Sequence, residues 1–134
     1  MAPTDTVSLI KANELSGSTG QTDGMARYGA IAGLSDKLNA NLMVAEPHTH
    51  SAVHHHGDQD TIVFGQKGKG AVVFNGGKDR VNIAPGDFAL IPAGVEHEEV
   101  NEGDEQVVWV IVRSGSVPKV VNLEGWGEAE KKQA

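Results

Sequence analysis

The most informative feature of this sequence is a series of short β-prone runs. They end in turns that contain glycine, proline or asparagine. From about residue 25 onward the clearest runs are Thr61–Phe64, Ala71–Phe74 and Val107–Val112. Asn75-Gly76, directly after the second run, is the strongest short hairpin signal that a sequence can carry. Glycine contributes 17 of the 134 residues, well above the usual ~7%. Strands joined by turns every ~8–12 residues, with almost no helical period, predict an all-β sandwich or barrel.

The length suits one domain, and the pattern changes along the chain. Residues 1–24 are rich in serine, threonine, glycine and aspartate and show no sustained period, so we expect an N-terminal arm with one short strand near Val7–Ile10. Residues 25–123 carry the strand pattern of the barrel. Residues 124–134 are expected to form a frayed or weakly helical tail.

Composition excludes several classes of protein. The chain has no cysteine, which excludes disulfides, a thiolate metal site and a cysteine nucleophile. Its net charge is −7 and no cluster of lysine and arginine exceeds the pair Lys131–Lys132, which argues against a nucleic-acid partner. The longest apolar run is far too short for a membrane span, and the N-terminal segment lacks the apolar stretch of a signal peptide. We therefore expect a soluble, cytoplasmic protein that binds neither nucleic acid nor membrane.

Histidine is concentrated in one place. Five of the six histidines lie between His48 and His56, and the sixth is His97. Because residues i and i+2 of a strand share a face, His54 and His56 are predicted to point the same way, and Asp60 has the same parity. Three imidazoles and a carboxylate suit iron, manganese, cobalt, nickel, copper or zinc, whereas magnesium and calcium prefer oxygen ligands. A solvated histidine turn without a metal is the alternative.

Two segments carry a resemblance to a known family. Segment 86–101 reads GDFALIPAGVEHEEVN and matches every fixed position of the second motif of the cupin superfamily, G-x5-P-x-G-x2-H-x3-N. Segment 54–68 reads HHHGDQDTIVFGQKG and resembles the first motif, G-x5-H-x-H-x3,4-E-x6-G, with three departures. His48 stands in place of the leading glycine, Asp60 replaces the glutamate, and Gly68 comes one residue late.

The resemblance implies a single antiparallel jelly-roll barrel, which is one of the all-β options above. It also implies that His54, His56 and His97 bind a metal, because they occupy the ligand positions of the two motifs. Asp60 is expected to complete the site. Since aspartate is one methylene shorter than glutamate, the alternative is that Asp60 only orients one of the imidazoles.

Other residues are candidates for roles around the metal. His50 is a candidate proton shuttle or substrate ligand at the cavity mouth, unless it is an ordinary loop histidine. Glu99 shares the parity of His97 and is a candidate general base, unless it belongs to a solvated acidic edge. Arg27 and Arg113 are candidates to anchor a substrate carboxylate. The cavity wall is expected to include inward residues such as Ile62, Phe64, Phe88 and Leu90.

The resemblance implies a metal-dependent enzyme that acts on a small oxygenated organic molecule. The reactions it implies are non-haem oxygenation of the dioxygenase type and metal-assisted decarboxylation, isomerisation or cyclisation. One divalent transition metal is expected, with iron or manganese favoured over zinc, nickel, copper or cobalt. The alternatives are a non-catalytic cupin module that binds a metal or small ligand, and a metal-free isomerase using His54 or His97 as acid and base. Free strand edges and the resemblance predict a homodimer.

Overall fold

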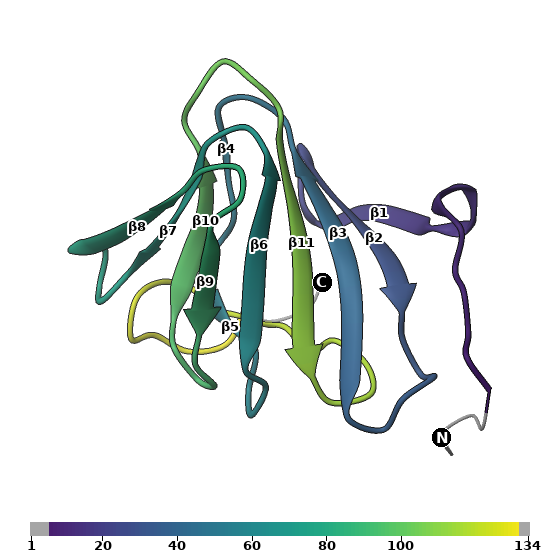
Figure 1. Ribbon diagram of the computed structural model, residues 1–134. Helices are drawn as coiled ribbons and strands as arrows, with labels where there is room; N and C mark the ends of the chain where they lie inside the picture. Colours follow the sequence, from purple (N-terminus) through teal and green to yellow (C-terminus); the bar gives the residue numbers. More distant parts are fainter. Residues whose placement is uncertain (1–5, 132–134) are drawn as a thin grey trace.

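The computed structural model describes residues 6–131, which form two antiparallel sheets facing each other (Figure 1). Sheet A contains, in spatial order, β1 (Ser16–Thr22), β2 (Met25–Ile31), β3 (Leu38–Ala45), β11 (Val107–Ser114), β6 (Thr61–Lys67) and β9 (Phe88–Ile91). Sheet B contains β12 (Val121–Asn122), β5 (His54–His55), β10 (His97–Asn101), β7 (Gly70–Phe74) and β8 (Asp79–Ile83), and β4 (Thr49–His50) also pairs with β10. The predicted all-β jelly-roll barrel is confirmed.

The core lies between the two sheets because apolar side chains alternate along the strands. On β11, Val107, Trp109 and Ile111 point inward with at most 1% of their surface exposed, and the residues between them face outward. The buried cluster is made of Met25, Met43, Ala45, Val63, Val72, Ile83, Ile91, Val107, Trp109 and Ile111. Sequence-distant strands lie side by side here, since β11 pairs with both β3 and β6.

The hairpin predicted at Asn75-Gly76 is present between β7 and β8. Asn75 and Gly76 have φ values of 54° and 67°, a left-handed conformation that asparagine and glycine tolerate better than other residues.

The two ends differ from the prediction. Val7–Ile10 form no strand, and the strand of this region is β1, which pairs with the edge of β2. Its sequence SGSTGQT has no apolar alternation, so β1 owes its place to backbone hydrogen bonding rather than to side-chain burial. The described part of the tail contains no helix. Leu123 instead bridges to Glu130, while residues 1–5 and 132–134 lie outside the described part. The described chain has one short 3-10 helix, η1 (Ala12–Glu14), and no helix long and apolar enough to cross a membrane.

The expected cavity wall was wrong for Ile62, Phe64 and Phe88, whereas Leu90 borders a cavity although most of it is exposed. Ile62, Phe88 and Leu90 lie on the outer face of sheet A with 45%, 73% and 65% of their surface exposed. Phe64 is on the same face, where its ring packs against Phe88 at a centroid distance of 4.8 Å. The reason is register: β6 begins with Thr61 pointing inward, so the alternating set one residue later faces outward.

Candidate metal centre

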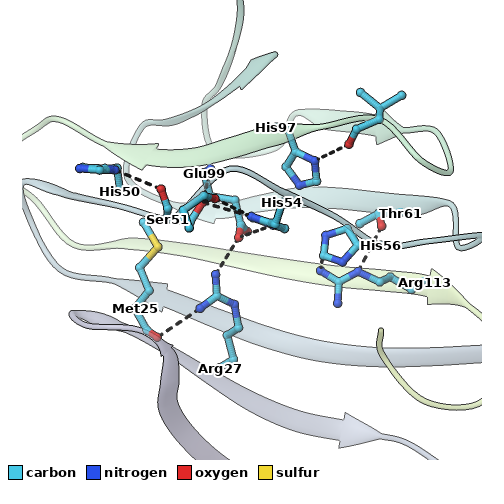
Figure 2. A network of polar contacts seen from close by, with 12 residues as sticks. Met25, Arg27, His50, Ser51, His54, His56, Thr61, His97, Glu99 and Arg113 are labelled. Carbon is cyan, nitrogen blue, oxygen red and sulfur yellow. Dashed lines mark hydrogen bonds and ion pairs between the residues drawn. The ribbon is translucent and has the colours of Figure 1, made fainter. Parts of the chain in front are cut away.

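Three histidine side chains meet between the sheets. His54 lies on β5, His56 follows that strand, and His97 begins β10 directly opposite His54. One ring nitrogen from each lies within 4.8 Å of the others. The ring centroids are 4.3–5.1 Å apart (Figure 2). All three side chains are buried. The structure therefore brings together the three histidines singled out from the sequence.

Backbone carbonyls orient all three rings. His54 Nδ1 donates to the Ala52 carbonyl at 2.8 Å. His56 Nδ1 donates to the Lys119 carbonyl at 2.7 Å, and His97 Nδ1 donates to the Val95 carbonyl at 2.9 Å. Because a carbonyl oxygen only accepts, the proton of each neutral ring resides on Nδ1 and the lone pair on Nε2. Nε2 of His54 and of His97 is buried without any hydrogen-bond partner. A buried unsatisfied nitrogen is costly, and a metal ion bound to these lone pairs removes that cost.

The electrostatic surroundings keep the imidazoles neutral. Burial lowers the pKa of His54 to about 4, against a smaller opposing effect of Glu99. Burial and then the Arg113 guanidinium lower the pKa of His56 to about 3. Burial also lowers the pKa of His97 below its ordinary value. Neutral imidazole is the form that coordinates a metal, so the group is ready to bind one at neutral pH.

A carboxylate lies beside the histidines. Glu99, two residues after His97 on β10, is 3% exposed, and its Oε1 lies 2.7 Å from Arg27 Nη2 and 3.5 Å from His54 Nε2. Burial raises the pKa of Glu99, but the Arg27 guanidinium, followed by interactions with His54, His97 and Arg113, outweighs burial and holds this pKa well below its usual range. Glu99 is therefore an ionised group inside the barrel.

Arg113 approaches the histidines from β11. Its Nε donates to Thr61 Oγ1 at 3.1 Å and its Nη2 to His56 Nε2 at 3.3 Å, and the residue is 4% exposed. Burial lowers the pKa of Arg113 to about 10, which leaves it charged at neutral pH.

Two supporting hydroxyls carried no signal in the sequence. Thr61 holds Arg113, and Ser51 Oγ accepts from the Glu99 backbone N–H at 2.9 Å while donating to the Ala52 carbonyl. Isolated serines and threonines of this kind are common in any chain, so only the fold reveals their contacts.

Asp60 is not brought to the histidines. It is exposed, its Oδ1 accepts from the Ala93 backbone N–H at 2.9 Å, and its own N–H donates to Ser114 Oγ. The chain turns at Gly57, which has φ 61°, and β6 starts only at Thr61. Counting parity from His56 across that turn was therefore invalid. Asp60 ties the turn before His97 to the start of β6 instead.

His50 is also placed away from the group. It lies on the outer side of sheet B with 71% of its side chain exposed. Its Nδ1 is 3.0 Å from the Ser51 carbonyl oxygen (Figure 2) and 3.2 Å from Glu98 Oε2. β4 ends at His50 and residues 51–53 are not in a strand, so the alternation does not continue to His54. His48 is exposed beside Asp104.

One cavity is lined by a histidine of the group, and a second is lined by Arg113, which contacts His56. An apolar one of about 240 Å³ is lined by His97 together with Val72, Phe74, Val81, Ala89, Leu90, Ile91, Pro92 and Val95. A polar one of about 280 Å³ is lined by Arg27 and Arg113 together with Ser18, Gln21, Gly29, Asn41, Pro118 and Val120. The arrangement offers three histidine nitrogens that could hold a metal, an ionised carboxylate, two guanidinium groups and space for a small molecule.

Comparison with solved structures returns proteins of the same fold. The polyketide cyclase RemF from Streptomyces resistomycificus superposes with a TM-score of 0.74 at 15% identity, covering 87% of this chain and 85% of its own. A sugar phosphate isomerase of the cupin superfamily from Silicibacter pomeroyi gives 0.67 at 23% identity, covering 92% of each chain. Oxalate decarboxylase from Lactobacillus farciminis gives 0.72 at 21% identity, covering 85% of this chain and 35% of its own. At these identities the likeness shows the fold alone.

No curated protein matches this chain in sequence. The family model described as Cupin domain matches residues 41–113. That span covers more than half of the 134 residues and contains all three buried histidines. The chain therefore belongs to the cupin family.

Proposed function

We propose that this protein is a metal-dependent enzyme acting on a small oxygenated organic molecule, with one divalent transition metal held by Nε2 of His54, His56 and His97. The observation that carries the proposal is the pair of buried, unpartnered Nε2 atoms on rings whose Nδ1 atoms are all anchored to carbonyls. Three nitrogen ligands of a rigid barrel leave coordination positions for substrate oxygens.

A bound metal supplies either redox chemistry, as in non-haem oxygenation of the dioxygenase type, or Lewis-acid chemistry, as in decarboxylation, isomerisation or cyclisation. We favour iron or manganese over zinc, nickel, copper or cobalt. The names of three structurally similar proteins, a cyclase, an isomerase and a decarboxylase, support action on a small molecule.

Glu99 is the proposed proton acceptor. Its carboxylate is ionised, buried and 3.5 Å from His54 Nε2, so it can take a proton from a substrate bound beside the histidines. Arg27 holds the carboxylate in place through the 2.7 Å ion pair. The same ion pair favours the second candidate, a non-catalytic module that binds a metal or small ligand, because a carboxylate engaged by a guanidinium is a weaker base.

Metal content of tag-free protein, measured by elemental mass spectrometry, tests the proposal. We expect close to one transition metal per chain, lost in His97→Ala and in His56→Ala and retained in His50→Ala, an exposed histidine outside the group. Circular dichroism checks that each variant is folded. Wild-type protein that holds no metal and takes up none would overturn the proposal. If metal binds but no candidate small molecule is turned over and no oxygen is consumed, the binding module replaces the enzyme.

We further propose that two copies associate through the outer face of sheet A. Ile62 lies beside Leu90, and Phe64 beside Phe88, with Val112 and Val110 on the next strand. β3 continues the face with Leu38, Ala40, Leu42 and Val44. These outward positions of β9, β11 and β3 and of residues 61–64 carry no charge, although the chain has a net charge of −7.

Area and charge both favour a second copy as the partner of this face. Monomers rarely expose an apolar patch larger than a few hundred Å², and a standard interface needs roughly 800 Å² on each partner. The face spans β9, β6, β11 and β3, and Phe88 and Leu90 on it have 73% and 65% of their surface exposed. Because the rest of an acidic surface repels its copy, an uncharged apolar face is where two copies meet at lowest cost.

A further inference from the structure

The charges inside the barrel do not balance. Among the described residues the buried carboxylate is Glu99, and two guanidinium groups lie within reach of it or of the histidines. Arg27 forms the ion pair with Glu99 at 2.7 Å. The side-chain partners of Arg113 are Thr61 Oγ1 and His56 Nε2, both of them neutral. Glu99 raises the pKa of Arg113 only through longer-range attraction and already forms its ion pair with Arg27, so within residues 6–131 Arg113 is a buried cation without an ion pair. Such a charge is costly, and proteins compensate it with ligands or counterions.

The contact between Arg113 and His56 conflicts with metal binding. His56 Nε2 has one lone pair, which accepts from Arg113 Nη2 at 3.3 Å in this structure. The same nitrogen cannot accept that bond and coordinate a metal at once. With a metal bound at His56 Nε2, Arg113 Nη2 would lose this acceptor and would have an N–H to donate to a ligand. A carboxylate oxygen is the acceptor that best matches a guanidinium.

The polar cavity has space and further polar groups for such an acceptor. Arg27 and Arg113 line it together with Asn41, which is 8% exposed and whose Oδ1 is buried without a hydrogen-bond partner. His97 lines the apolar cavity together with residues such as Val72, Ala89 and Ile91. The ring of His56, which contacts Arg113, and the ring of His97 have centroids 5.1 Å apart.

We propose that the barrel binds a small carboxylate whose anionic group lies against Arg113 in the polar cavity and whose apolar part occupies the cavity beside His97. That this carboxylate is the substrate, and that Arg113 Nη2 is released from His56, rest on the proposed function; the buried guanidinium without an ion pair does not. The proposal selects a compact acid with an apolar or aromatic body over neutral molecules of the same shape.

Calorimetric titration of the full chain with benzoate, benzyl alcohol and acetate tests the proposal, on zinc-loaded protein and on protein treated with a chelator. Benzoate is expected to bind at least about 10-fold more tightly than benzyl alcohol, which has the same body without the charge. It is also expected to bind more tightly than acetate, which lacks the apolar part. Equal affinity for benzoate and benzyl alcohol, or no benzoate binding, would overturn the inference.

Variants identify the residue responsible. Arg113→Met is expected to weaken benzoate binding at least about 10-fold, and Arg113→Lys less. Arg80→Met is the matched control because Arg80 is exposed and pairs with Glu102. Since Arg113→Met removes a buried cation, it should fold with unchanged or higher Tm, and benzoate should raise the Tm of the wild type but not of this variant. Undiminished benzoate affinity in folded Arg113→Met would contradict the proposal.

The two proposals can fail separately. Benzoate binding to protein that takes up no metal would refute the proposed metal enzyme and leave the carboxylate site standing. Stoichiometric metal with no benzoate binding would refute the carboxylate site and leave the proposed metal enzyme standing.

Discussion

The Nε2 atom of each of the three buried histidines is oriented by the hydrogen bond that Nδ1 makes on the other side of the ring. The carbonyls of Ala52, Lys119 and Val95 are backbone atoms, so a substitution at those positions leaves the acceptor in place. Orientation of the rings is therefore built into the path of the chain rather than into polar side chains. This explains why the sequence alone shows three histidines but not what holds them.

The side chain of Asn101, the last fixed position of the second motif, hydrogen-bonds backbone groups rather than a histidine. It is 1% exposed. Its Nδ2 donates to the carbonyls of Ala45, Glu46 and Glu105 at 2.9–3.1 Å, and its Oδ1 accepts from Gly103 N–H at 3.1 Å. One side chain thus joins the ends of β3 and β10 to the turn that precedes β11.

Asn101→Asp is expected to lower the free energy of unfolding by about 2–4 kcal/mol, because a carboxylate cannot donate to the carbonyls and would be buried among them. Urea unfolding followed by circular dichroism measures the change. Asn82→Asp, at an exposed strand position of β8, is expected to cost less than about 0.5 kcal/mol. Equal effects of the two substitutions would show that the buried contacts of Asn101 do not contribute to the free energy of unfolding.

Strands β6 and β9 present one face to the core and the other face to solvent. Inward, Thr61 and Val63 contribute to the arginine contact and the core. Outward, the same strands present Ile62, Phe88 and Leu90 to solvent. Strands that are apolar both toward the core and toward solvent are typical of a sheet whose outer face is covered by a partner.

Phe88→Lys combined with Leu90→Lys is expected to convert the proposed dimer into a monomer, since two ammonium groups would be buried against a second copy. Light scattering at micromolar concentration should report twice the 14.1 kDa chain mass for the wild type and 14.1 kDa for the double variant. Val117→Lys, also an exposed apolar position but outside this face, should remain a dimer. A wild-type chain that is monomeric under these conditions would contradict the proposal.

At the scale of the whole molecule, burying three imidazoles couples stability to pH. In the unfolded chain His54 and His56 titrate near their ordinary value of 6.5, whereas the folded values are about 4 and about 3. As pH falls below 6.5 the unfolded chain therefore binds protons that the folded protein does not. Their contribution to stability is complete above about pH 6.5 and is lost as the pH falls toward the folded values.

Chelator-treated protein is expected to lose on the order of 2 kcal/mol for each of these two histidines between pH 7.5 and pH 5, measured by urea unfolding at each pH. His56→Gln should flatten the dependence, because glutamine does not titrate. His50→Gln should not, since His50 is exposed. Stability that stays constant over this range would show that the histidines are not buried as neutral rings.

Much of the fold and part of the site could be predicted from local patterns. Three predictions rest on neighbouring residues: the β-prone runs, the Asn75-Gly76 hairpin and the spacing of the two motifs. The structure and the family match confirm them. β1 could not be predicted, because its pairing with β2 depends on a free edge created elsewhere in the chain.

By itself the sequence determined an all-β barrel, the cupin family and the three histidines, because alternation and motif spacing are local. The tertiary structure decided which side of each strand faces the cavity. One turn at Gly57 removed Asp60 from the group, and a register set by Thr61 moved Phe88 and Leu90 to the outer face. It also brought Arg113 to His56, 57 residues apart in sequence. Parity holds only within a continuous strand, and contacts between strands depend on how distant segments pair.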